Sequence, residues 1–272
     1  QILAQHNMLE EGVLESKAFR ESMSKLGFAE VWVSPAFDMT FNFEDKAPEI
    51  FNSLMKDLAD KSGYQELATV PVIPIGHSAL ASYPWNFAAW NPERTLAVIS
   101  LKGDAPQTNL TGSGKPNPDW EGRNIDGVPG LMIMGEYEWW EDRLKPGLEY
   151  VRKHPNSPIT WYADAGRGHF DFSDQLIQIL TLYIEKAAKA RLPEGSGRAL
   201  KPVNVRDGYV MELWNKEKKQ KEQLIKYRNF KGDRSQTSWV FDKELAQAIQ
   251  SVYNNSYGKL AQYLDFSQNG KI

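Results

Sequence analysis

Short apolar runs alternate with longer amphipathic stretches over the first 192 residues. The apolar runs have the length of buried strands, and the stretches between them repeat apolar residues at the three- and four-residue spacing of a helix. Strands are expected at residues 1–4, 29–34, 70–75, 96–101, 131–134 and 159–163. Helices are expected at residues 9–26, 48–58, 86–90, 148–151 and 176–184. Strands that alternate with helices predict an α/β fold, with a mainly parallel sheet flanked by helices.

The alternation stops at Pro193, beyond which Gly195-Ser196-Gly197 breaks the pattern. We therefore expect a catalytic domain at residues 1–192 and a C-terminal extension at residues 193–272, mostly helical or linking to a further domain. Within the extension, a Lys/Glu-rich helix is expected at 211–227 and an amphipathic helix at 243–252. Glu217 and Glu222 lie between the lysines, which favours a solvated helix face over a contact with a polyanion.

Composition narrows the classes of partner. The chain is 41% apolar and 25% charged, with a net charge of -3, so it lacks the overall basic field that nucleic acid binding needs. A small-molecule substrate or a neutral polymer such as a polysaccharide ester fits better. The absence of cysteine excludes disulfides, a thiol nucleophile and thiolate metal sites. No oligomeric state is indicated.

The start of the chain bears on where the protein works. No apolar run reaches the roughly 18 to 20 residues of a membrane helix, and no signal segment opens the sequence. We expect no membrane insertion. Gln1 stands in place of an initiator methionine and already belongs to an apolar segment, which suggests a processed or truncated product. A periplasmic or secreted location is the prediction, and the cytoplasm is also compatible.

A candidate nucleophile follows the third expected strand, in Gly76-His77-Ser78-Ala79. A serine hydroxyl needs a base to become nucleophilic, and a sharp strand-to-helix turn with small neighbours exposes it at the sheet edge. Leu80 stands where the G-x-S-x-G pattern has a small residue, and Pro84 would kink the helix that follows. Alone, the segment fits a helix N-cap serine as well as a nucleophile.

The histidines offer one good base. His77 adjoins the serine and is expected to point away from it, while His154 belongs to an exposed helix end. His169 lies in Gly166-Arg167-Gly168-His169-Phe170, a glycine-rich loop directly after the last expected strand. A loop at that position brings a base to the edge of the sheet where Ser78 is expected, so His169 is the predicted general base.

The acid and the oxyanion donors are expected at other strand ends. Glu138 lies three residues beyond Gly135, at the end of the strand 131–134, and Glu136 is the alternative acid. Either carboxylate could hold the imidazole in one tautomer and stabilise its charged form. The backbone N–H of Ala79 is one expected oxyanion donor. The second is expected from Asn7 or Met8, which follow the first strand.

Five segments occur in an order typical of one enzyme superfamily: Gly76-His77-Ser78-Ala79, Trp85-Asn86-Phe87-Ala88-Ala89, Asn91-Pro92-Glu93-Arg94, Gly135-Glu136-Tyr137-Glu138 and Gly166-Arg167-Gly168-His169-Phe170. Together they resemble the α/β-hydrolase superfamily of serine hydrolases, most closely bacterial esterases and polymer depolymerases. The resemblance implies that residues 1–4 are the third strand of an eight-stranded sheet. The two strands before it are then missing, so either the chain is a fragment or another segment completes the sheet.

The resemblance also implies a substrate pocket at the carboxyl ends of the strands, and no metal or organic cofactor. Candidate walls are Trp85, Lys102, Trp139 and Trp140. Aromatic rings can stack on sugars, so the leading hypothesis is a serine esterase that forms an acyl-enzyme at Ser78 on a carbohydrate ester, such as an acetylated plant polysaccharide. The alternatives are a catalytically silent carbohydrate-binding or scaffolding protein on the same fold, a peptidase, and a polyester depolymerase.

Overall fold

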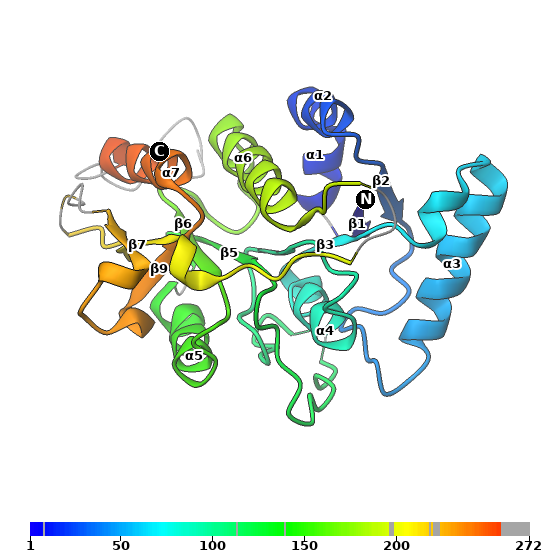
Figure 1. Cartoon of the computed structure of the whole chain (residues 1–272), viewed down its shortest axis with the longest axis horizontal. Coiled ribbons are helices and arrows are strands. Elements are labelled where there is room, and N and C mark those ends of the chain that lie inside the picture. Colours follow the sequence, from blue (N-terminus) through cyan, green and yellow to red (C-terminus); the bar gives the residue numbers. More distant parts are fainter. Residues whose placement is uncertain are drawn as a thin grey trace, which may run out of the picture.

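A six-stranded parallel sheet forms the centre of the molecule (Figure 1). The structure, a computed structural model, describes residues 1–7, 9–112, 114–138, 140–195, 199–217, 219 and 224–256. The strands, in their spatial order, are β2 (Glu30–Val33), β1 (Ile2–Gln5), β3 (Ile73–His77), β4 (Val98–Leu101), β5 (Gly130–Gly135) and β6 (Ile159–Asp164). Every neighbouring pair is parallel. The predicted fold class is therefore confirmed.

Helices cover both faces of this sheet. The helices α1, α2, α6 and α7 lie over one face, and α4 and α5 lie over the other, with α3 beside α4 (Figure 1). Their bounds are α1 (Leu9–Glu15), α2 (Lys17–Lys25), α3 (Ala47–Ser62), α4 (Tyr83–Trp90), α5 (Trp140–Lys153), α6 (Asp174–Arg191) and α7 (Lys243–Ser256). Because both faces are covered, the strands need apolar residues on both sides, which explains their continuous apolar runs.

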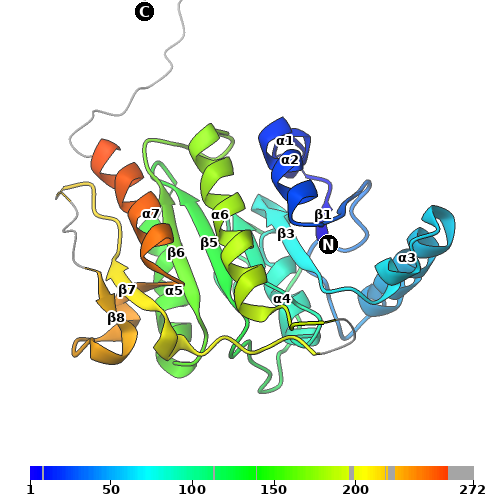
Figure 2. The ribbon, with the colours of Figure 1, turned by 45° about the horizontal axis from the view of Figure 1, so that its top comes forward.

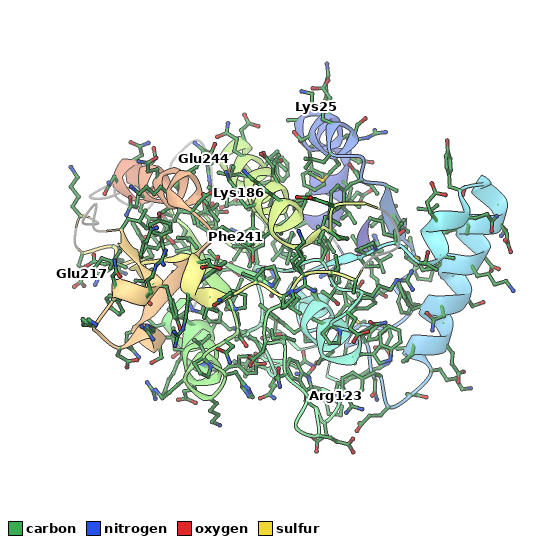
Figure 3. The ribbon with its side chains drawn as sticks, in the orientation of Figure 1. Lys25, Arg123, Lys186, Glu217, Phe241 and Glu244 are labelled. Atoms are coloured by element: carbon green, nitrogen blue, oxygen red, sulfur yellow. The ribbon has the colours of Figure 1, made fainter. Side chains whose placement is uncertain are left out.

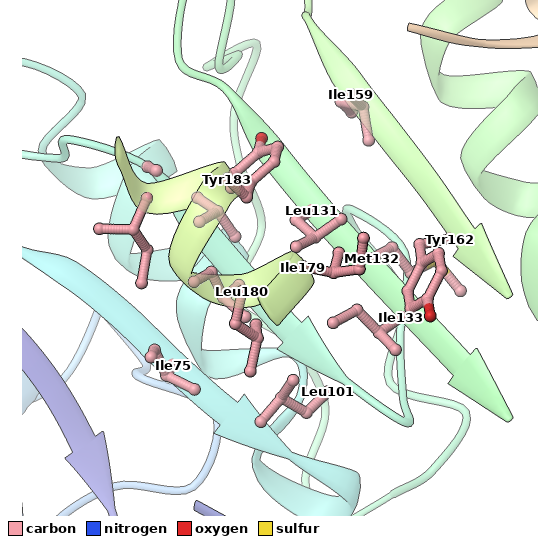
Figure 4. Close-up of a cluster of buried hydrophobic side chains, with 14 of the residues drawn as sticks. Ile75, Leu101, Leu131, Met132, Ile133, Ile159, Tyr162, Ile179, Leu180 and Tyr183 are labelled. Atoms are coloured by element: carbon pink, nitrogen blue, oxygen red, sulfur yellow. The ribbon is translucent and has the colours of Figure 1, made fainter. Parts of the chain in front are cut away.

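The core between α6 and the sheet shows this arrangement. Leu180 and Tyr183 of α6 pack over the strands, above apolar side chains that include Leu131 and Ile133 (Figure 4). All four side chains are fully buried. Burying a large apolar side chain contributes roughly 1.5–3 kcal/mol. This packing holds the strands rigidly, and parallel strands bring their carboxyl ends to one edge, where the loops that carry the candidate residues begin.

The two prolines expected within the third strand lie where they disturb its hydrogen bonds little. Pro71 precedes β3, and Pro74 lies inside it. Pro74 falls between the isolated bridge that joins Val72 to Thr95 and the first β3–β4 pair, Ile75 with Ile99. The ladder to β4 is interrupted at this point, so the donor that proline lacks is not needed there.

The C-terminal extension differs from the expectation. Residues 209–212 form a strand, β7 (Tyr209–Glu212), rather than the start of a Lys/Glu-rich helix, so the helix predicted at 211–227 is wrong there. With β8 (Ile225–Lys226) and β9 (Thr237–Val240), β7 builds an antiparallel sheet in the order β8-β7-β9. The predicted amphipathic helix at 243–252 is present as α7. The described part of the extension is therefore a small antiparallel sheet, three short 3-10 turns and one α-helix, in place of the two helices expected.

The small sheet and α7 protect the edge of the main sheet at β6 (Figure 2). Ser238 of β9 accepts the backbone N–H of Trp161 through its hydroxyl oxygen (2.8 Å), and the hydroxyl of Tyr253 in α7 accepts the N–H of Ala163 (3.0 Å). An unpaired sheet edge invites pairing with other chains. Side chains of the C-terminal extension thus take the place of a further strand beside β6.

None of the helices in the described part of the chain combines the length and the apolar character needed to cross a membrane.

Candidate active site

Ser78 occupies a sharp turn at the end of β3. Its backbone φ is +54°, in the left-handed region that residues other than glycine rarely adopt. The chain continues as one turn of 3-10 helix, η2 (Ser78–Leu80), before α4 begins at Tyr83. A backbone conformation of this kind costs on the order of 1–3 kcal/mol and persists where the surrounding structure enforces it. Ser78 therefore does not cap α4, and its hydroxyl is turned to the loop after β6.

The two departures from the nucleophile-turn pattern have local explanations. Because a 3-10 turn precedes α4, Pro84 lies in the first turn of the helix, where proline is favoured, and does not kink it. Leu80 is fully buried. The position in this turn that has to be glycine is 76, because a Cβ on Gly76 would lie 2.0 Å from the carbonyl oxygen of Leu80.

His169 and Glu138 complete a hydrogen-bonded chain with Ser78. The Nε2 atom of His169 lies 2.7 Å from the Oγ of Ser78, and its Nδ1 contacts the Oε1 of Glu138. A carboxylate can only accept, so Nδ1 carries the hydrogen and the lone pair of Nε2 faces the serine hydroxyl. The side chain of Glu138 is 7% exposed, whereas that of His169 is 27% exposed. The imidazole is thus reachable from solvent, while the carboxylate behind it is shielded.

Glu138 and the alternative acid Glu136 have different partners. The second oxygen of Glu138 accepts the backbone N–H of Gly135 (2.8 Å), which fixes the carboxylate against its own strand. Glu136 accepts the N–H of Gly166 (2.7 Å) and so joins the loop after β5 to the loop that carries His169. The structure brings Glu138, not Glu136, to the imidazole.

The loop between β1 and α1 holds the turn from the other side. The side-chain amide of Asn7 donates to the carbonyl of His77 (2.6 Å), and the fully buried Glu10 accepts the N–H of the same residue (2.5 Å). The predicted oxyanion donors Ala79 and Asn7 therefore lie on the two segments that meet here. Met8, the other predicted donor, lies outside the described residues. Glu10 had no sequence signal beyond its place in a helical pattern.

His77, which was expected to point away from Ser78, packs against His169. Its ring is fully buried with its centroid 4.9 Å from that of His169, and its Nε2 lies 3.1 Å from the carbonyl oxygen of His169. A carbonyl only accepts, so Nε2 carries the hydrogen and donates it. Burial lowers the pKa of His77 to about 4. The neutral imidazole thus fixes the backbone of the loop that carries His169.

We expect His77 to make the protein less stable in acid. The folded protein keeps the pKa of this imidazole near 4, whereas a histidine in the unfolded chain has its ordinary pKa of about 6.5, so the unfolded chain binds more protons between these pH values. Stability then falls as the pH drops from 6.5 to 4, by about 3 kcal/mol in total from this group. Urea unfolding of the wild type and of His77→Gln across this range measures the effect. The variant should show the shallower dependence, and equal slopes would contradict the assignment.

A second group of residues that the sequence did not reveal holds the carbonyl of Ser78. The hydroxyl of Thr111 lies 2.8 Å from that oxygen and also contacts the buried carboxylate of Asp104. Asp104 further accepts the N–H of Leu110 (2.8 Å) and a guanidinium hydrogen of Arg143 (3.0 Å). Burial raises the pKa of Asp104, and these donors oppose that shift. The long loop after β4 is therefore tied to both the nucleophile turn and α5.

The expected substrate walls are placed differently. Trp85 is fully buried, and its indole N–H donates to the carbonyl of Asp104 (2.7 Å), so it belongs to the core. Lys102 is also fully buried and pairs with Asp164, so it cannot bind an acidic sugar at the surface or face solvent. Trp139 and the side chain of Trp140 lie outside the described part of the structure.

The described residues hold no cluster of three or more His, Asp or Glu side chains that could bind a metal ion. No family model and no curated protein matches the sequence. A solved structure of a phospholipase/carboxylesterase from Dyadobacter fermentans is similar over 68% of this chain and 88% of that chain, with 12% identity and a TM-score of 0.43. Similarity at that level says nothing about the chemistry of this site.

Proposed function

We propose that the protein is a serine esterase that hydrolyses a carboxylic ester through an acyl-enzyme at Ser78. The observation that carries the proposal is the hydroxyl of Ser78, held on a strained turn with its oxygen 2.7 Å from the Nε2 of His169. That distance is within the reach that a general base needs. The buried Glu138 on the far side of the imidazole supports the same role for His169.

The reaction has two steps. Ser78 Oγ attacks the ester carbonyl carbon while His169 takes the hydroxyl proton, and the same proton then passes to the departing alcohol oxygen. Water attacks the acyl-enzyme in the second step, with His169 again accepting and returning a proton, and the carboxylic acid leaves. The backbone N–H groups near Ala79 and Asn7 would stabilise the negative charge that develops on the carbonyl oxygen, an effect worth roughly 10²- to 10³-fold per donor.

The surroundings of the site favour an ester with an apolar group. Phe170, directly after the base, is 63% exposed and lies edge-on against the ring of His169, at 4.5 Å between centroids. Leu110, next to Thr111, is 55% exposed, and Phe172 is 40% exposed. Phe170 thus offers an exposed apolar ring directly beside the imidazole of His169, and an exposed apolar side chain at a site can form part of a binding surface. Trp85 and Lys102 are buried and provide no wall for a sugar, so they give no support to a carbohydrate ester. That substrate therefore stays a prediction.

Labelling with a fluorophosphonate probe tests the proposal. The probe reacts with a serine only when a neighbouring base activates it, so we expect one equivalent of label on the peptide that contains Ser78, located by mass spectrometry. Hydrolysis of p-nitrophenyl butyrate should exceed that of the acetate if the apolar side chains contact the acyl group. A folded wild-type protein that takes up no label and hydrolyses neither ester would refute the proposal and leave the silent binding protein in its place.

A further inference from the structure

A buried ion pair crosses the edge of the sheet beneath the candidate active site. Lys102 follows β4, and its ammonium lies 2.5 Å from the carboxylate of Asp164, the last residue of β6. The two side chains are 0% and 3% exposed. In the sheet, β5 lies between β4 and β6, so the side chain of Lys102 has to pass the end of β5, the strand that leads to Glu138.

A contribution to the free energy of unfolding does not explain why this pair is buried. Removing two charges from water costs several kcal/mol per ion, and replacing a buried pair by apolar residues of similar size is often neutral or stabilising. Burial raises the pKa of Asp164, while the ammonium of Lys102 opposes that shift. Lys102 also has a backbone φ of +49°, an unfavourable conformation for a lysine. A costly pair on a strained residue suggests a role beyond holding the fold.

Asp164 joins the loops that carry the acid and the base. Its carbonyl oxygen accepts the N–H of Arg167 (3.2 Å), two residues before His169, and the N–H of Glu136 (3.3 Å), two residues before Glu138. The same two loops meet again where the N–H of Tyr137 donates to the carbonyl of Arg167 (3.2 Å). Any shift of Asp164 would therefore move both partners of the proton-transfer chain.

Lys102 is connected to the nucleophile turn. Its backbone N–H donates to the carbonyl of Ile133 in β5 (2.7 Å). The next residue, Gly103, passes so close to the turn that a Cβ there would lie 1.9 Å from the Cβ of Ala81 and 3.4 Å from the carbonyl oxygen of Ser78. The ion pair thus spans from the segment packed on Ser78 to the residue that anchors His169.

We propose that Lys102 and Asp164 are positioning residues whose buried ion pair sets the distance between Ser78 and His169. The proposal rests on the serine esterase function proposed above. A displacement of about 1 Å between a nucleophile and its base can cost roughly 10²-fold in rate. The pair acts through the backbone of the two loops and does not contact the substrate.

The double variant Lys102→Met/Asp164→Leu tests this role, because both replacements have nearly the shape of the original side chains and leave no unpaired buried charge. We expect a folded protein with a urea unfolding midpoint close to that of the wild type. Its kcat for p-nitrophenyl butyrate and its rate of fluorophosphonate labelling should both fall at least about tenfold, as expected for misplaced reacting groups. KM should change little, since the pair lies away from the surface that binds the ester.

Lys186→Met is the matched control. Lys186 of α6 pairs with Asp242 (2.9 Å) and with Glu244 at the start of α7, and its ion pairs include neither Asp164 nor any of Ser78, His169 and Glu138 (Figure 3 labels Lys186 and Glu244). Removing the lysine charge from this pair should leave kcat and the labelling rate at the wild-type values. A fall in this control equal to that of the double variant would mean that loss of any lysine pair slows the enzyme, which contradicts a specific role for Lys102.

The possible results separate this proposal from the proposed function. A wild type that labels normally, together with a folded double variant that labels and turns over at the wild-type rate, overturns only the positioning role. If the double variant does not fold, Lys102→Met/Asp164→Asn keeps the size of the side chain at residue 164 and is judged by the same rates. Loss of the fold in both variants would show that the pair is structural and would equally overturn the proposal.

Discussion

Replacing Ser78 by alanine is expected to abolish measurable ester hydrolysis, with a fall in kcat/KM of at least about 10³-fold. The variant keeps the buried neighbours of the turn and loses one hydroxyl, the atom 2.7 Å from the Nε2 of His169. Without it, His169 has no nucleophile to activate, and only binding and oxyanion stabilisation remain. Steady-state hydrolysis of p-nitrophenyl butyrate measures the loss, and urea unfolding should show that stability is nearly unchanged.

Ser82→Ala is the matched control for this loss. Ser82 lies four residues further on, is 2% exposed, and its hydroxyl makes no hydrogen bond to any described residue. Removing that hydroxyl should leave both the rate and the unfolding free energy near the wild-type values, because no partner loses a bond. Wild-type turnover in Ser78→Ala, or an equal loss in Ser82→Ala, would contradict the role given to Ser78.

The positions of the candidate residues could be predicted from the sequence, because each of these residues follows a short buried strand. A strand covered on both faces is continuously apolar, and the first polar residues after it mark the edge of the sheet. Ser78, Glu138 and His169 were all found in this way. Their mutual contacts could not be derived, since spatial order is set by the packing of distant segments. The choice between Glu136 and Glu138, two residues apart on one loop, likewise depended on the structure.

Buried polar residues were the hardest to predict. Lysine and tryptophan are residue types that binding surfaces often use, so Lys102 and Trp85 were expected to line a pocket. A sequence does not show that a lysine will pair with a carboxylate 62 residues away inside the protein. The hydroxyl of Thr111 gave no signal either, because its loop has no periodic pattern. Lys102 violates the usual preference for exposed charges, and buried charges of this kind tend to belong to functional or strained regions.

The error in the C-terminal extension has a different cause. The lysines and glutamates from Lys216 onward favour a helix by propensity. The predicted helix was therefore extended back over Met211, which belongs to the short apolar run Tyr209-Val210-Met211. In the structure that run pairs with β9, and Gly208 before it approaches the ring of Trp239 so closely that a Cβ would lie 2.5 Å from it. Contacts between segments thirty residues apart thus override the local preference.

Replacing Glu138 by glutamine is expected to lower kcat by roughly 10³- to 10⁴-fold, because it reverses the tautomer of His169. One oxygen of Glu138 accepts the N–H of Gly135, and the other meets the Nδ1 of His169. An amide has a single oxygen, and the N–H of Gly135 can only donate, so the oxygen has to face Gly135. The amide nitrogen then donates to Nδ1 and leaves the hydrogen of the imidazole on Nε2.

With that hydrogen on Nε2, His169 faces the hydroxyl of Ser78 as a donor and cannot accept its proton. Glu136→Gln serves as the control, because Glu136 lies on the same loop and its side chain bonds only the backbone N–H of Gly166 among the described partners. An amide oxygen can take over that bond, so the rate should stay within about fivefold of the wild type, the factor that corresponds to the roughly 1 kcal/mol of one neutral hydrogen bond. In ¹⁵N spectra of the imidazole, the protonated nitrogen should move from Nδ1 in the wild type to Nε2 in Glu138→Gln. A large rate loss in Glu136→Gln with a mild one in Glu138→Gln would instead make Glu136 the acid and require the loop after β5 to rearrange during turnover.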